Sequence, residues 1–164
     1  MNFKIISLLT IFFLFLGCSN KANKYVTTSD ILHEQAITQT QRTIIKDGEN
    51  AQAYILVTYL NQIKHSMIKL DGKTEQFIVN IYIPSEENQK LYNEISCIIN
   101  NKEQKPLKEL KPSDKLLKVI PAVTSWSKYY LYEAPVNEKS KNILFKFKTN
   151  SNESSTLTFV KDYL

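Results

Sequence analysis

Hydrophobic and polar residues alternate along much of the chain with a period of two. In the stretch 76–83, the residues Phe77, Val79, Ile81 and Ile83 fall on one face. Such a period is the signature of β-strands, whose successive side chains point to opposite faces of a sheet. The pattern predicts strands at 53–60, 64–70, 76–83, 91–99, 126–133, 142–149 and 156–162.

Other parts of the pattern differ. The segment 30–37 has helical spacing and predicts a short helix. The Thr- and Ile-rich segment 38–46 fits either a helix or a strand. The charged segment 102–121 carries three of the five prolines and predicts a long crossing with short strand pieces.

Turn-forming pairs separate the predicted strands. Asp71-Gly72 and Asn100-Asn101 are typical of tight turns, because these residue types tolerate a positive φ. About seven strands joined by short polar turns predict a mainly β, antiparallel β-sandwich with a short N-terminal helix.

The N-terminus follows a different pattern. Lys4 precedes an apolar run from 5 to 16, which is shorter than the roughly 20 residues that a spanning helix needs but fits a signal peptide. The letters FLGC, ending in Cys18, resemble a bacterial lipobox. We therefore expect a lipoprotein signal peptide at 1–17, a lipidated Cys18 with a flexible tether over 18–28, and one domain over 29–164. A buried core helix or an uncleaved anchor is the alternative.

That interpretation implies a location. Acyl chains on Cys18 would hold the protein on a membrane, because two or more chains give stable anchoring. Ser19 follows the cysteine, whereas Asp at this place tends to retain lipoproteins in the inner membrane. We therefore predict an outer-membrane lipoprotein, with the periplasmic or surface-facing side left open.

The number and type of charged residues limit the classes of partner that the chain can bind. The chain has a formal net charge of +5, but Arg42 is its only arginine and no basic run occurs. Arginine is the preferred residue for bidentate contacts with phosphates and bases. We therefore predict no nucleic-acid partner, while a weak attraction to anionic lipid or polysaccharide stays open.

The sequence carries no catalytic signature. It contains two histidines, His33 and His65, and lacks a G-x-S-x-G elbow, a Gly-rich phosphate loop and an H-E-x-x-H motif. If lipidation uses Cys18, the remaining Cys97 lies among isoleucines as a buried, inert thiol. We predict no enzymatic activity, no metal site and no cofactor other than the covalent lipid.

One aromatic cluster has functional content. Trp126, Tyr130 and Tyr132 would share a strand face with Lys128 among them. Packing in the core is one interpretation of this pattern. The other is an exposed binding surface for sugar rings or a protein partner, because rigid rings provide contact area at low entropic cost.

Three stretches carry a family resemblance: AYILVTYLN at 53–61, WSKYYLYEAP at 126–135 and LTFVKDYL at 157–164. They resemble segments of small epsilonproteobacterial lipoproteins with a variant immunoglobulin-like β-sandwich, some of which are regarded as adhesins. The resemblance implies an immunoglobulin-like fold and a lipid-anchored binding or adhesion module of the envelope. Alternatives are a periplasmic carrier of an apolar or lipid ligand, and an accessory lipoprotein of an envelope assembly.

Overall fold

The computed structural model describes residues 28–161, with only the backbone for 28–30. The predicted signal peptide, Cys18 and the tether up to residue 27 lie outside the described residues, as do 162–164. By its contacts the chain divides into 1–31 and 32–164, and the fold below is that of the second unit. Within residues 28–161, no helix combines the length and the apolar character needed to cross a membrane.

The described part of the chain is mainly β, with nine strands and few helices. In chain order the elements are α2 (Thr28–Thr38), β1 (Thr40–Asp47), β2 (Asn50–Tyr59), β3 (Thr74–Tyr82), η2 (Glu86–Asn88), α3 (Leu91–Glu94), β4 (Ser96–Ile99), β5 (Lys102–Gln104), β6 (Lys108–Leu110), η3 (Lys115–Val119), β7 (Lys128–Pro135), β8 (Asn142–Lys148) and β9 (Leu157–Val160).

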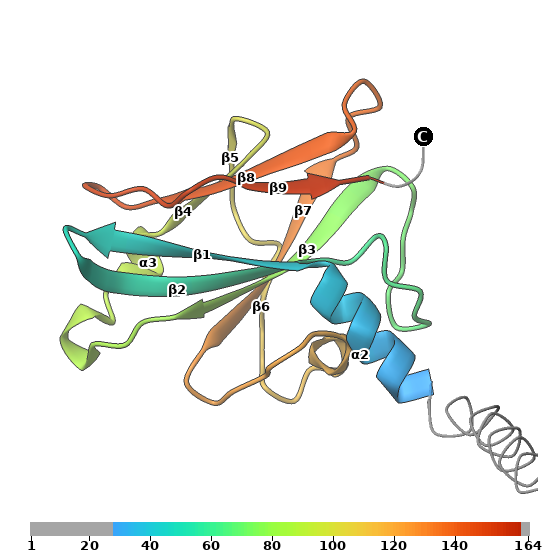
Figure 1. Cartoon of the computed structure of the whole chain (residues 1–164), viewed down its shortest axis with the longest axis horizontal. Coiled ribbons are helices and arrows are strands. Elements are labelled where there is room, and N and C mark those ends of the chain that lie inside the picture. The colour runs from blue at the N-terminus through green and yellow to red at the C-terminus, as the bar shows by residue number, and fades with distance from the viewer. Residues whose placement is uncertain (1–27, 162–164) are drawn as a thin grey trace, which may run out of the picture. The chain divides into compact units, whose positions relative to one another are not determined.

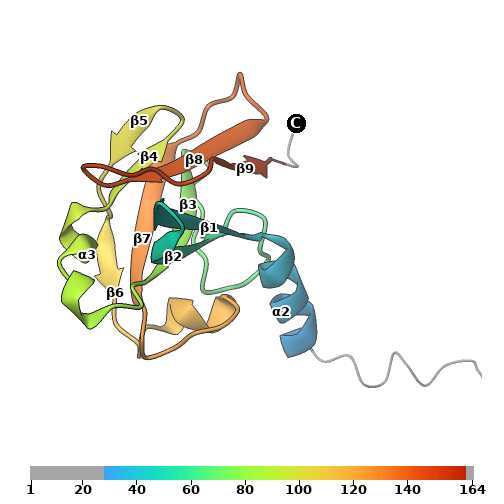
Figure 2. The same cartoon turned by 60° about the vertical axis from the view of Figure 1, so that its left-hand side comes forward.

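The strands form two antiparallel sheets (Figures 1 and 2). Sheet A has the order β1-β2-β3-β7-β6, and sheet B has the order β5-β4-β8-β9. Two-residue turns close the β1–β2 and β4–β5 hairpins, at residues that tolerate a positive φ. Gly48 adopts φ +58° between the paired Asp47 and Asn50, and Asn100 and Asn101 adopt φ +50° and +64° between the paired Ile99 and Lys102.

A main core lies between the sheets. The alternating residues predicted for β3 and β8 all point into it, and they meet apolar residues of β2, β7 and β9. Phe77 is at its centre. Its ring lies 4.5 Å from that of Phe145, 5.0 Å from Tyr59 and 5.7 Å from Phe159, between centroids. Burial of these rings against each other holds the two sheets together.

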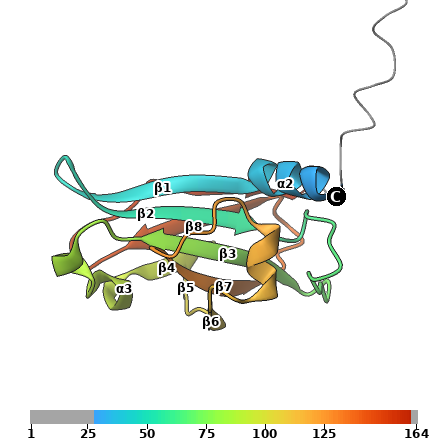
Figure 3. The same ribbon diagram turned by 90° about the horizontal axis from the view of Figure 1, so that it is seen from below.

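A second core covers part of the other face of sheet A, which we call the outer face. Ile78, Tyr129 and Leu131 of this face pack against Leu117 and Val119 of η3, with further residues from α2, β6 and the loop after β2. Figure 3 views the outer face, with the orange segment that contains η3 lying over the strands and sheet B behind them. The side chains of β3 thus enter two different cores.

Four sequence predictions about the strands need correction or refinement. The segment 64–70 is a loop, because Met67 and Ile68 turn into the second core instead of alternating. The ambiguous segment 38–46 becomes mostly strand β1. The stretch 91–99 begins as helix α3, whose Leu91 and Tyr92 pack on the main core. The crossing 102–121 contains the predicted short strand pieces as β5 and β6. With β1 and these two added and 64–70 removed, the count is nine strands and not about seven.

Buried polar side chains link the two sheets at the end of β9. Lys161 and Glu75 are each 1 % exposed, with Lys161 Nζ 3.7 Å from Glu75 Oε1. The Tyr59 hydroxyl donates to Glu75 Oε2 at 2.6 Å, and Lys161 Nζ donates to the carbonyl of Asn137 at 2.6 Å. This cluster joins the last strand to β2 and β3 of the opposite sheet.

Side-chain amides satisfy the backbone of β9. Gln41 of β1 donates to the carbonyl of Thr158 at 2.6 Å and accepts from its N–H at 3.3 Å. Gln62 donates to the carbonyl of Val160 at 2.7 Å. An edge strand with unpaired backbone groups invites pairing with another chain, and these amides occupy groups of that edge.

Candidate functional site

An open hollow of about 440 Å³ lies on the outer face of sheet A. We call it the aromatic groove. It is lined by Tyr54 and Leu56 of β2, Asn80 and Tyr82 of β3, and Ala122, Thr124, Trp126 and Ser127 of the loop before β7. None of these side chains carries a charge at neutral pH. Its volume is within the range of small-molecule sites, about 300–1,000 Å³.

The groove floor follows from the period of the strands. Tyr54 pairs with Tyr82, and Leu56 pairs with Asn80, so the four side chains stand on one face of neighbouring strands. The rings of Tyr54 and Tyr82 stack with centroids 6.1 Å apart and planes inclined by 28°. The second core covers the same face further along the strands, and the floor is the part that stays exposed.

The loop 122–127 forms the groove wall, and hydrogen bonds with the buried Tyr129 hold this loop in place. Tyr129 is buried in the second core, and its hydroxyl accepts from the N–H of Thr124 at 2.6 Å and donates to the carbonyl of Thr124 at 3.0 Å. Ala122 adopts φ +57°, a conformation that non-glycine residues rarely adopt. The loop thereby presents Trp126, the only tryptophan of the chain, 77 % exposed.

Asn80 is the one polar side chain of the groove that is nearly buried. It is 5 % exposed, and its Oδ1 atom has no hydrogen-bond partner in the structure. Most buried polar side-chain atoms in folded proteins have a partner, so an unsatisfied one calls for an explanation. A ligand that supplies a hydrogen-bond donor in the groove would be such an explanation.

We expect the substitution Asn80→Leu to raise the free energy of unfolding by about 1–3 kcal/mol, because it replaces an unpaired buried amide by an apolar group of similar size. Urea unfolding monitored by circular dichroism measures the change as a higher midpoint at an unaltered slope. A lower midpoint would mean that the Asn80 amide stabilises the unliganded fold.

The four residues of the predicted aromatic surface do not lie together. Trp126 belongs to the turn before β7 and lines the groove, whereas Lys128, Tyr130 and Tyr132 occupy alternate positions of β7 on the side that faces the main core. Tyr132 is buried in that core, and Tyr130 packs against it. The prediction of one shared strand face is therefore wrong for Trp126, because β7 begins two residues after it.

The environments of these residues agree with that placement. Burial raises the pKa of the Tyr132 hydroxyl far above its ordinary value. Burial, with the charge of Glu109, raises the pKa of Tyr130 to about 12. The ammonium of Lys128 lies 4.4 Å from the centre of the Tyr92 ring, a cation–π contact.

Sequence analysis missed seven of the eight groove residues, among them Tyr54, Asn80 and Tyr82, on which the binding argument depends. Two signals were available in the sequence. One was an asparagine, Asn80, inside an otherwise apolar predicted strand, and the other was a tyrosine in each of two predicted strands, Tyr54 and Tyr82. The pairing of Tyr54 with Tyr82 becomes visible only when the register of β2 and β3 is known.

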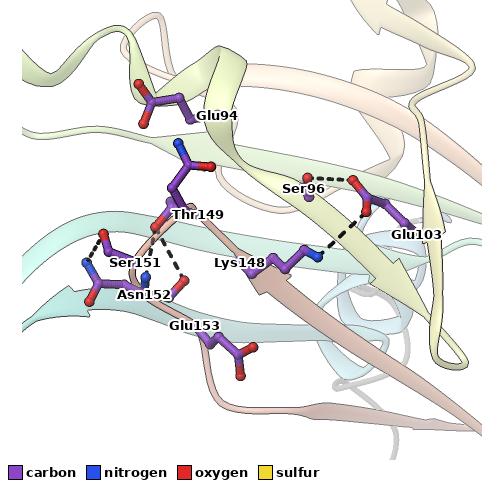
Figure 4. A pocket seen from close by; sticks show the side chains of 9 residues that line it. Glu94, Ser96, Glu103, Lys148, Thr149, Ser151, Asn152 and Glu153 are labelled. Carbon is purple, nitrogen blue, oxygen red and sulfur yellow. Dashed lines mark hydrogen bonds and ion pairs between the residues drawn. The ribbon is translucent and has the colours of Figure 1, made fainter.

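A second hollow, of about 570 Å³, lies on sheet B near the β8–β9 turn and is polar (Figure 4). Three of the charged side chains that line it, Glu103, Lys148 and Glu153, form ion pairs. Lys148 lies 3.7 Å from Glu103, and Lys146 pairs with Glu153. The hydrogen bond from Ser96, followed by the charge of Lys148, lowers the pKa of Glu103. These exposed pairs make a solvated surface with little stabilising effect.

The remaining reactive residue types are dispersed. The Cys97 thiol is buried, and burial raises its pKa, which disfavours the reactive thiolate. His33 is exposed, and His65 Nδ1 accepts from the backbone N–H of Met67 at 3.1 Å within a loop. Over residues 28–161, no group of three or more His, Cys, Asp or Glu side chains is arranged to hold a metal ion.

Comparison with known protein families, with characterised proteins and with solved structures found no match to this chain. The aromatic groove on sheet A, with its unpaired Asn80 oxygen, therefore carries the functional argument.

Proposed function

We propose that this chain is a lipid-anchored outer-membrane protein that acts by binding a neutral partner in the aromatic groove. The signal-peptide pattern and the lipobox-like sequence ending in Cys18 support the anchor. The groove supports the binding role, because Tyr and Trp side chains are the residue types most enriched where proteins hold partners. The partner is neutral because no charged side chain lines the groove.

One observation carries the binding proposal. Asn80, with its unpaired buried oxygen, lies at the floor of a hollow that is also lined by three exposed aromatic rings, those of Tyr54, Tyr82 and Trp126. Either feature alone has a structural explanation. Together they match the usual composition of a binding site, which is mostly apolar and aromatic with a few placed polar groups.

We also propose that the fold is a variant immunoglobulin-like sandwich. When β1 is set aside, sheet A has the order β2-β3-β7-β6 and sheet B the order β5-β4-β8-β9. In chain order these strands follow the immunoglobulin pattern of an ABED sheet opposite a CFG sheet, with β5 as an added C′ strand and β1 as an extra edge strand. The resemblance to immunoglobulin-like lipoproteins is part of the same proposal.

The double substitution Tyr54→Ala/Tyr82→Ala should reduce binding to the partner at least tenfold, because it removes both rings of the groove floor while the cores stay intact. The full-length chain is immobilised, and solubilised envelope material of its own bacterium is passed over it. The retained mass is then measured by biolayer interferometry.

Leu144→Ala is the matched control, because Leu144 and Tyr82 are both 37 % exposed and Leu144 lies on β8 of sheet B. Its retention should equal that of the wild type. Undiminished retention by a folded Tyr54→Ala/Tyr82→Ala protein would refute the role of the groove.

A further inference from the structure

We infer that the ligand of the aromatic groove is a neutral saccharide, an inference that rests on the binding function proposed above. The groove offers flat apolar faces, hydroxyl groups and one buried amide, without a charge. A pyranose ring presents an apolar C–H face and a rim of hydroxyl groups. The C–H face of the sugar can pack against the aromatic rings of the groove, and its hydroxyl groups can form hydrogen bonds with the Asn80 amide.

The unpaired oxygen of Asn80 favours neutral ligands that carry a hydrogen-bond donor. Asn80 Oδ1 is an acceptor that is buried without a partner, and an amide turned toward the groove would let it accept from a donor on the ligand. A hydrocarbon chain has no donor, and the proline rings of a proline-rich peptide lack the N–H group. Every saccharide hydroxyl is both a donor and an acceptor.

The amide has the freedom to make this contact. The χ2 torsion of asparagine is broad and roughly two-fold, so either the oxygen or the NH₂ group can be presented to the groove. Neighbouring hydroxyls of a sugar ring can then pair with the amide as donor and acceptor together. This would satisfy the group that the unliganded protein leaves unpaired at a 95 % buried side chain.

The aromatic rings complete the site from two directions. Tyr54 and Tyr82 stack on each other on the sheet, and Trp126 belongs to the tethered loop that lines the same groove. Each of the three rings is exposed, so a sugar ring can pack against them.

Two treatments of the envelope material test this inference in the retention assay. Periodate cleaves the vicinal diols of sugars, and proteinase K removes proteins. We expect periodate to reduce retention at least tenfold and proteinase K to leave it intact. If retention survives periodate, or is lost with proteinase K, the inference that the ligand is a saccharide is wrong. The proposed binding function is not affected by that result. No retention of untreated material refutes the binding function itself.

The protein-free neutral polysaccharide fraction of the same envelope provides a direct readout. Polysaccharide contains no indole, and excitation at the red edge of the indole absorption avoids the nine tyrosines. The fluorescence of the full-length chain, in a detergent without a sugar head group, then reports Trp126 alone. The wild type and Leu144→Ala should show a saturable shift in emission. Tyr82→Ala and the stably folded Asn80→Leu should need at least tenfold more polysaccharide, and an unchanged titration of both variants would exclude the groove as the saccharide site.

Discussion

Replacing Lys161 by methionine should lower the free energy of unfolding by about 3–5 kcal/mol, a loss typical of breaking a buried ion pair. The side chains of Lys161 and Glu75 are both 1 % exposed. The substitution removes the cation from beside the Glu75 carboxylate and the donor from the carbonyl of Asn137. Urea unfolding of the full-length chain measures the effect.

The double variant Glu75→Gln/Lys161→Met separates charge from packing. Glutamine is neutral and can still accept the hydrogen bond that the Tyr59 hydroxyl gives to Glu75. The double variant should therefore be more stable than Lys161→Met alone. Equal losses in the two variants would show that the ammonium does not act by compensating the carboxylate.

The substitution Phe77→Ala should cost about 3–5 kcal/mol of stability, because it leaves a cavity at the centre of the main core. Phe77 is fully buried and contacts the rings of Tyr59, Phe145 and Phe159 from both sheets. Relaxation can fill little of the space, since the surrounding residues are held in paired strands. Thermal and urea unfolding measure the loss.

Leu144→Ala is again the matched comparison, because Leu144 lies on the solvent side of β8 between Ile143 and Phe145. Partly exposed surface substitutions of this kind usually change stability by less than about 0.5 kcal/mol. A loss at Phe77 no larger than that at Leu144 would contradict the assignment of the core between the sheets.

The two stability predictions bear on the groove through strand β3. This strand carries Glu75 and Phe77 toward the interior and Asn80 and Tyr82 toward the groove. A binding site is effective when its side chains are held by a rigid supporting structure. The main core and the buried Lys161 cluster supply that support on the opposite face of the same strand.

The strands could be predicted from the sequence where the cause is local. Alternation in 76–83 and 142–149 reflects backbone geometry, and β3 and β8 follow it. The predicted tight turn at 100–101 joins β4 to β5, with Asn100 and Asn101 at positive φ. The tight turn predicted at 71–72 is instead a bend in the long loop before β3, although Gly72 does adopt a positive φ. The prediction was wrong at 64–70, where packing against η3 and the outer face of sheet A outweighs strand propensity.

The candidate site could be predicted only for Trp126. Its exposure was one of two interpretations of the pattern, and the strand face assumed for it was wrong. Tyr54 and Tyr82 are 28 residues apart in sequence and meet only through the register of β2 with β3. Lys161 reads as an ordinary surface lysine, because lysine is rarely buried unless it is paired.

The sequence by itself determined the β character of the chain, the period of its main strands, the tight turn at 100–101 and the absence of a catalytic signature. These depend on backbone sterics and residue chemistry within a few positions. The tertiary structure decided which end of the outer face of sheet A is covered, and therefore that Asn80 is buried beside exposed rings. That outcome depends on the order of the strands and on how far η3 and its loop reach, which are set by long-range burial and not by any local pattern.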